Sequence, residues 1–251
     1  MSRPKSFQVA GVDGCRGGWC VAVARAVNKS GGPHAGPFLA MKSLFVSCTF
    51  AEVLAETGNC ELLCVDIPIG LSDGEAARAC DIEARRLLRG PRASSVFPAP
   101  VRPCLLADDY ETACAISLEH SGKKLSRQSF ALLEKIREVD DLMTPALQNR
   151  VREIHPEISF YALNGGVSLL QNKKTVPGQA HRYHLLDRAF TNVGDVLADA
   201  APDGYGMDDA LDALVAAWTA AQAVRGKART LPPGPQRDSR GLRMEILCPA
   251  W

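Results

Sequence analysis

Runs of hydrophobic residues along the first third of the chain predict its opening elements. Residues 7–12 and 19–26 are apolar and flank a glycine-rich turn, which predicts an antiparallel hairpin. The run at 38–47 predicts a third strand. Three consecutive strands joined in this way indicate an antiparallel start to a sheet.

A helix and a fourth strand follow. Thr49 and Glu52 form a capping-box pattern, which predicts a helix from about 50 to 57. The uninterrupted apolar run at 61–71 is typical of a strand buried on both faces. A right-handed helical crossover would place this strand beside the first and parallel to it. This order is that of an RNase H-like α/β fold, a mixed five-stranded sheet with flanking helices.

The rest of the chain departs from this pattern and then returns to it. We predict a helical insertion at about 72–150 within a single RNase H-like domain over 7–225, followed by a C-terminal loop and a possible edge strand at 226–251. The helical stretches expected within the insertion are 74–90, 106–120 and 126–143. Those expected after it are the end of 151–163, which begins as a strand, then 178–199 and 208–224.

Acidic residues occur where the predicted elements meet. Asp13 ends the first strand and Asp66 lies toward the end of the fourth, so in neighbouring strands about 5 Å apart they would lie side by side. Asp209 and Asp212 are three residues apart and share one face of the last helix. Taken alone, the helical acids are also explained by Asp208 as an N-cap with solvated acids after it.

Together these carboxylates suggest a site for divalent cations. Several carboxylates in one buried site raise each other's pKa, and hard cations such as Mg²⁺ or Mn²⁺ relieve that repulsion. Two such ions about 4 Å apart can activate a water and stabilise the leaving oxygen of a phosphodiester. We therefore expect a metal-dependent nuclease or phosphodiesterase whose catalytic and metal-binding residues are Asp13, Asp66, Asp209 and Asp212.

Several segments carry a resemblance to a known family. They are G-V-D-G-C-R-G-G-W at 11–19, V-D-I-P-I-G-L at 65–71, S-V-F-P-A-P-V-R at 95–102, K-I-R-E-V-D at 135–140, E-I-H-P-E-I-S-F at 153–160 and D-D-A-L-D-A at 208–213. In these the chain resembles domain-of-unknown-function family 429, a family of predicted nucleases with an RNase H-like fold.

A second resemblance concerns the last helix. D-A-L-D-A-L at 209–214 is similar to the C-terminal catalytic helix of bacterial Holliday-junction resolvases. This resemblance implies that Asp13, Asp209 and Asp212 are metal ligands. Resolvases usually have a glutamate where this chain has Asp66.

Candidate substrate contacts surround these acids. In E-I-H-P-E, His155 is a candidate general base or phosphate contact and Glu157 an additional metal ligand; a capping glutamate beside a packed histidine is the alternative. Arg16 follows Asp13 in the glycine turn and is expected near bound phosphate. Further candidate phosphate contacts, which are otherwise an ordinary solvated helix surface, are Arg85, Arg89 and Arg92 at helical spacing, with Arg102 and Lys135.

Composition narrows the classes of protein. The formal net charge is +1, so no global positive field indicates a protein that coats nucleic acid. Nine cysteines without a C-x-x-C pair fit free thiols in a reducing cytosol. The first residues lack the apolar core of a signal peptide, and no apolar run reaches the ~18 residues that span a membrane. We expect a cytoplasmic protein without membrane contact.

Two other functions remain open at this point. Phosphate-binding proteins of the actin and sugar-kinase type share the core and the acid-plus-glycine hairpin, but they normally use two such lobes. A non-catalytic nucleic-acid-binding adaptor would keep the fold without turnover. The expected partner is a nucleic acid or nucleotide substrate.

Overall fold

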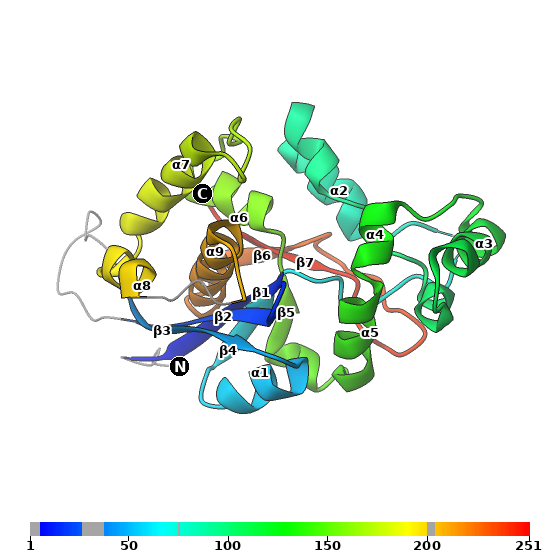
Figure 1. The fold of residues 1–251 in the computed structure, drawn as a ribbon, viewed down its shortest axis with the longest axis horizontal. Coiled ribbons are helices and arrows are strands. Elements are labelled where there is room, and N and C mark those ends of the chain that lie inside the picture. The colour runs from blue at the N-terminus through cyan, green and yellow to red at the C-terminus, as the bar shows by residue number, and fades with distance from the viewer. Residues whose placement is uncertain (1–5, 27–37, 75, 200–203) are drawn as a thin grey trace. The chain divides into compact units, whose positions relative to one another are not determined.

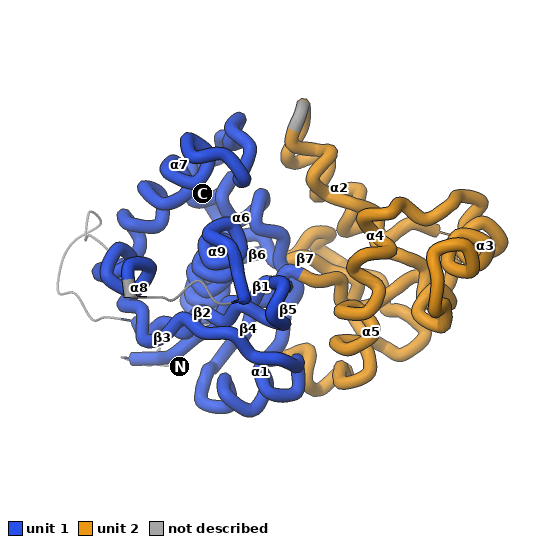
Figure 2. Tube along the Cα trace, viewed as in Figure 1, with its two compact units in different colours: residues 1–66, 150–229, 247–251 blue, residues 67–149, 230–246 orange. Residues whose placement is uncertain are grey.

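The computed structural model describes residues 6–26, 38–74, 76–199 and 204–251. The chain forms two compact units, coloured separately in Figure 2. Unit 1 contains residues 1–66, 150–229 and 247–251, and unit 2 contains residues 67–149 and 230–246. The interval expected as an insertion thus falls almost entirely in unit 2, which also includes a stretch of the C-terminal region.

Unit 1 is built on a mixed five-stranded sheet in the order β3-β2-β1-β4-β5 (Figure 1). β1 is antiparallel to β2 and parallel to β4, β2 is antiparallel to β3, and β4 is parallel to β5. The expected parallel pairing of the first and fourth strands is therefore confirmed. The strands are β1 (Gln8–Cys15), β2 (Gly18–Ala26), β3 (Leu39–Ser47), β4 (Leu62–Val65) and β5 (Val151–Glu153).

Helix α1 (Phe50–Glu56) packs on β2 and β3. The capping box expected from the sequence is present, because Thr49 Oγ1 accepts from Glu52 N at 3.2 Å while Glu52 accepts from Thr49 N at 3.3 Å. Trp19 of β2 is fully buried and meets Phe50 edge-to-face with ring centroids 5.1 Å apart. This aromatic pair fixes α1 against one face of the sheet.

Helix α9 (Met207–Val224) packs across β1, β2 and β4 (Figure 1). Its middle is almost entirely buried, and small alanines such as Ala213 and Ala217 allow a close approach to the strands. Around it lie α6 (Pro156–Leu163) and α7 (Val176–Asp187), while α8 (Val193–Asp199) packs on β3. This face contains the main hydrophobic core of unit 1.

Unit 2 consists mainly of short helices. Its helices are α2 (Ala79–Leu88), α3 (Tyr110–Ser121), α4 (Arg127–Ala131) and α5 (Leu133–Leu142), with 3₁₀ turns at Gly90–Ser95, Arg102–Leu106 and Leu147–Asn149. Apolar side chains such as Leu71, Ile136 and Met143 are fully buried within it. No helix among the residues described is both long and apolar enough to cross a bilayer.

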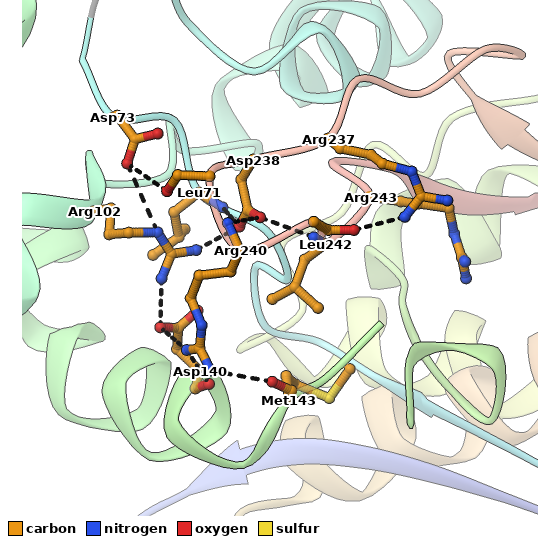
Figure 3. Close-up of polar contacts among 12 residues, drawn as sticks. Leu71, Asp73, Arg102, Asp140, Met143, Arg237, Asp238, Arg240, Leu242 and Arg243 are labelled. Carbon is orange, nitrogen blue, oxygen red and sulfur yellow. Dashed lines mark hydrogen bonds and ion pairs between the residues drawn. The ribbon is translucent and has the colours of Figure 1, made fainter. Parts of the chain in front are cut away.

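A charge network ties the C-terminal stretch of unit 2 to its helices (Figure 3). Arg102 forms ion pairs with Asp140 and Asp238, and Arg240 also pairs with Asp140 at 2.7 Å. The buried carboxylate of Asp238 accepts from the backbone N–H groups of Leu71, Arg240 and Leu242 at 3.1, 2.9 and 2.8 Å. Buried charges are tolerated when they are paired and hydrogen-bonded in this way.

Several boundaries expected from the sequence are corrected. The helix expected over 74–90 forms only over 79–88, and residue 75 lies outside the described residues. The helix ends there because Arg89 has a left-handed φ of 46° and Gly90 follows with φ 51°. The expected helix at 126–143 is divided into α4 and α5 at Leu132.

The C-terminal region also differs from expectation. Residues 226–241 were expected as a loop, yet β6 (Ala228–Leu231) forms within them and pairs with β7 (Ile246–Pro249) in a two-stranded sheet. Leu247 makes a single parallel bridge with Ile154 next to β5. The last residues therefore contribute one bridge at the edge of the main sheet, while the strand itself pairs elsewhere.

Candidate active site

Two acidic residues lie at the ends of adjacent parallel strands. Val12 of β1 pairs with Val65 of β4, so Asp13 and Asp66 follow on the next rung. The Asp66 N–H still donates to Val12 O at 3.0 Å, which continues the ladder past the end of β4. Side chains alternate along a strand, so Asp13 shares the face of Gly11. That face is the one that α9 covers.

Gly11 sets how closely α9 approaches this face. A Cβ at Gly11 would lie 2.1 Å from both Ala213 O and Ala217 N, inside the helix backbone. Only glycine permits this contact. The close crossing brings the first turns of α9, with Asp209 and Asp212, over the end of β1.

A hydrogen bond between a backbone N–H group and a side-chain carboxylate orients the start of α9. Asp209 lies in its first turn, where its Oδ2 accepts from Gly206 N at 2.8 Å. The hairpin turn between β1 and β2 is joined to the same segment, because Gly17 N donates to Gly204 O at 2.7 Å. Asp212, one turn further along the helix, is 1% exposed.

The carboxylates carry raised pKa values, mainly because they are buried. Burial raises the pKa of Asp13 well above its usual range, and repulsion from Asp66 and then Asp212 raises it further. Burial likewise raises the pKa of Asp66 and that of Asp209. Burial raises the pKa of Asp212 to about 7, against the opposing effect of Lys173. The four acids expected from the sequence therefore form one interacting group.

Lys173 is part of this group, and sequence reasoning missed it. Its ammonium forms an ion pair with Asp212, and the pKa of Lys173 is raised by the negative charges of Asp212, Asp13 and Asp66 even though burial opposes the shift. Nothing in Q-N-K-K-T distinguishes this lysine from Lys174, which is exposed. Only the fold shows which of the two faces the acids.

Divalent cations were expected at these side chains from the sequence. Among the described residues, no group of three or more His, Cys, Asp or Glu is arranged to hold a metal ion. The donor chemistry does fit such an ion, because Asp212 Oδ1 is buried without a hydrogen-bond partner. A buried, unpaired carboxylate oxygen is costly, and a hard cation is its natural partner. In the metal-free protein, the ammonium of Lys173 offsets part of the negative charge of these acids.

The sequence matches the model of one protein family. The model described as "Protein of unknown function (DUF429)" matches residues 11–237, which is most of the chain. The chain belongs to this family. No curated protein and no solved structure matches it. The family name carries no activity, so membership in DUF429 adds nothing to the chemistry deduced from the site.

In this DUF429 member, burial raises the pKa of Asp66, the charge of His155 lowers it and the charge of Glu157 raises it. His155 precedes α6, and its Nδ1 accepts from Glu157 N at 3.2 Å, with Pro156 in the first helical turn as expected. Glu157 itself forms a buried ion pair with Arg182. In the structure its carboxylate therefore balances an arginine that is fully buried.

The expected phosphate-binding basic residues fall into two groups. Arg16 is exposed in the hairpin turn of unit 1, directly after the strand that carries Asp13. The other five belong to unit 2, and they do not lie on one helix: Arg85 is in α2, Arg89 ends it, Arg92 and Arg102 lie in 3₁₀ turns, and Lys135 is in α5. The guanidinium of Arg85 donates to Val96 O at 2.7 Å, and that of Arg102 is engaged by Asp140 and Asp238.

Proposed function

We propose that this DUF429 protein is a metal-dependent phosphodiesterase of RNase H-like architecture, acting on a nucleic acid or nucleotide. The architecture is supported by the strand order, by the parallel neighbour of β1 and by the single helix that crosses the sheet above them. The observation that supports the chemistry is the placement of Asp13 and Asp66 on neighbouring strand ends beneath α9, whose Asp212 and Asp209 also raise the pKa of Asp13.

Each residue has a task in this proposal. Bound Mg²⁺ or Mn²⁺ would activate a water and stabilise the leaving oxygen of the phosphodiester. Buried Asp13 and Asp212 and half-buried Asp66 would supply carboxylate oxygens to hold the cations, and Asp209 would complete the set from the first turn of α9. The strands and α9 exclude bulk water from beneath the acids, which strengthens their attraction for a cation.

His155 is assigned a substrate contact. Because Nδ1 accepts a backbone hydrogen bond, the neutral ring carries its proton on Nε2. A ring protonated on Nε2 is a hydrogen-bond donor there and cannot remove a proton from water through that nitrogen. Arg16 has the exposure and the position in the hairpin turn to meet the same phosphate.

Binding of phosphate or nucleic acid without turnover is the second candidate function, and one observation favours it. The Lys173–Asp212 ion pair already offsets part of the negative charge, as in a site that binds phosphate through lysine alone. The two candidates differ in what happens when divalent cations are added.

The test is cleavage of labelled single-stranded DNA, duplex DNA, RNA and a four-way junction in Mg²⁺ and in Mn²⁺. We expect turnover of at least one substrate, and loss of at least 10³-fold in Asp13→Asn and in Asp66→Asn because the cations lose a ligand. Circular dichroism checks that both variants remain folded. Undiminished cleavage by the purified double variant would refute the mechanism.

A further inference from the structure

The segment that carries Lys173 is held rigidly from both sides. Thr175 N and Thr175 Oγ1 donate to Asn172 O at 3.0 and 2.8 Å, and Lys174 N donates to Asn172 Oδ1 at 2.9 Å. The buried guanidinium of Arg182 donates to Gln171 O at 3.2 Å. These bonds fix the backbone on either side of Lys173 and so restrict where its ammonium can reach.

Lys173 is the more exposed partner of its ion pair with Asp212. The side chain of Lys173 is 35% exposed, whereas that of Asp212 is 1% exposed. A ligand that approaches the carboxylates from solvent on this side meets a positive charge before it meets a negative one. The charge of Lys173 also acts on Asp13, Asp66 and Asp209, so it is the shared counter-charge of the whole group.

We propose that Lys173 is a substrate-binding residue of this site, which pairs with Asp212 in the metal-free protein and binds the substrate phosphate once divalent cations occupy the carboxylates. This inference rests on the proposed function. The ammonium holds Asp212 Oδ2, so a cation bound through the unpaired Oδ1 brings a second positive charge against it and drives the lysine outward. The anchored segment keeps the displaced ammonium at the mouth of the site, where a phosphate oxygen is its remaining anionic partner.

The test compares Lys173→Met, which removes the charge at similar length, Lys173→Arg, which keeps it, and Lys174→Met, which removes an exposed charge one residue away. Mn²⁺ binding is measured first by electron paramagnetic resonance without substrate. Inorganic phosphate is then added to the Mn²⁺-loaded protein, and its binding is followed by the paramagnetic relaxation of the ³¹P signal. Asp13→Asn serves as the variant that lacks a metal ligand.

We expect Lys173→Met to bind Mn²⁺ about fivefold more tightly, because the competing ammonium is gone, and phosphate about fivefold more weakly. Lys173→Arg should retain phosphate binding. Lys174→Met, which removes a charge that acts on Asp209 but leaves Lys173 paired with Asp212, should change both affinities far less than Lys173→Met does. A merely structural lysine would not change the two affinities in opposite directions.

Other outcomes separate the two proposals. If wild type binds Mn²⁺ through Asp13 but Lys173→Met behaves like Lys174→Met, or changes only Mn²⁺ affinity, the role of Lys173 in phosphate binding is overturned while the metal site stands. If none of the proteins binds Mn²⁺ at millimolar concentration, the metal site is overturned and the exchange of partners falls with it.

Discussion

At the scale of single residues, the site is defined by carboxylates whose pKa is raised by burial and by repulsion from neighbouring acids. Asp212 shows this most clearly, because its pKa of about 7 lies far above the ordinary value of 3.8 despite the ion pair with Lys173. Desolvation outweighs the salt bridge here, because Asp212 is almost fully buried whereas Lys173 is partly exposed. The metal-free fold therefore pays for keeping this residue ionised near neutral pH.

This cost predicts a pH dependence of stability. A raised carboxyl pKa means that the folded state binds more protons than the unfolded state between about 4 and 7, so the contribution of Asp212 to stability falls as pH rises through that window. In urea unfolding with EDTA, Asp212→Asn should gain roughly 2–4 kcal/mol relative to wild type between pH 4.5 and 7.5.

A residue with the opposite shift gives the control for that sign. Hydrogen bonds from Thr112 lower the pKa of exposed Asp109, so Asp109→Asn should lose stability relative to wild type as pH rises to about 4, and the two profiles should run parallel above that pH. Parallel pH profiles for wild type and Asp212→Asn would contradict the account of Asp212. Saturating Mn²⁺ should remove most of the difference, because the cation compensates the charge that the metal-free fold cannot.

At the scale of elements, the site depends on the crossing of β1 by α9. Gly11→Ala places a Cβ against backbone atoms of α9, which cannot rotate away as a side chain could. We expect a loss of at least ~3 kcal/mol in unfolding free energy, together with weaker Mn²⁺ binding, since α9 must shift and take Asp212 with it.

Gly234→Ala is the matched control for that prediction, because nothing lies within 4 Å of a Cβ at Gly234. Urea unfolding followed by tryptophan fluorescence measures both variants. A Gly11→Ala protein as stable as Gly234→Ala would mean that α9 does not approach β1 as closely as described.

The same scale shows what can be predicted from the sequence. The hairpin, the capping box at Thr49 and the parallel pairing of β1 with β4 follow from local patterns and from crossover handedness, both of which act over short stretches of chain. From that pairing the neighbouring positions of Asp13 and Asp66 follow as well. The C-terminal helix is likewise evident from its long apolar pattern.

What could not be predicted depends on contacts between distant segments. Lys173 meets Asp212 across 38 intervening residues, and Glu157 meets Arg182 in the same way, so no local spacing reveals either pair. Arg85, Arg89 and Arg92 do not share one helix for a local reason, because the backbone at Arg89 and Gly90 has positive φ and ends α2. β6 is only four residues long and takes its stability from pairing with β7.

At the scale of the whole molecule, the chain divides into two units, and the candidate metal ligands all belong to unit 1. Unit 2 has its own buried residues and its own charge network, centred on Asp238 (Figure 3). This division implies that unit 2 can be loosened without dismantling the carboxylate site.

Asp238→Asn tests that independence. The substitution removes the charge that Arg102 pairs with and weakens the bonds from Leu71 and Leu242, at a cost on the order of 3 kcal/mol to unit 2. Hydrogen exchange read by mass spectrometry should accelerate within 67–149 and 230–246, while β1 and α9 stay protected. Equal acceleration in β1 and α9 would show that the two units unfold as one.

The most direct test of the central claim is to locate Mn²⁺ by anomalous diffraction from crystals soaked at millimolar concentration. This measurement needs no choice of substrate. The account predicts one or two ions bound by Asp13, Asp66 and Asp212 with Asp209, Lys173 displaced from Asp212, and Glu157 still paired with Arg182. Soaked crystals in which these acids bind no ion and Lys173 remains on Asp212 would contradict it.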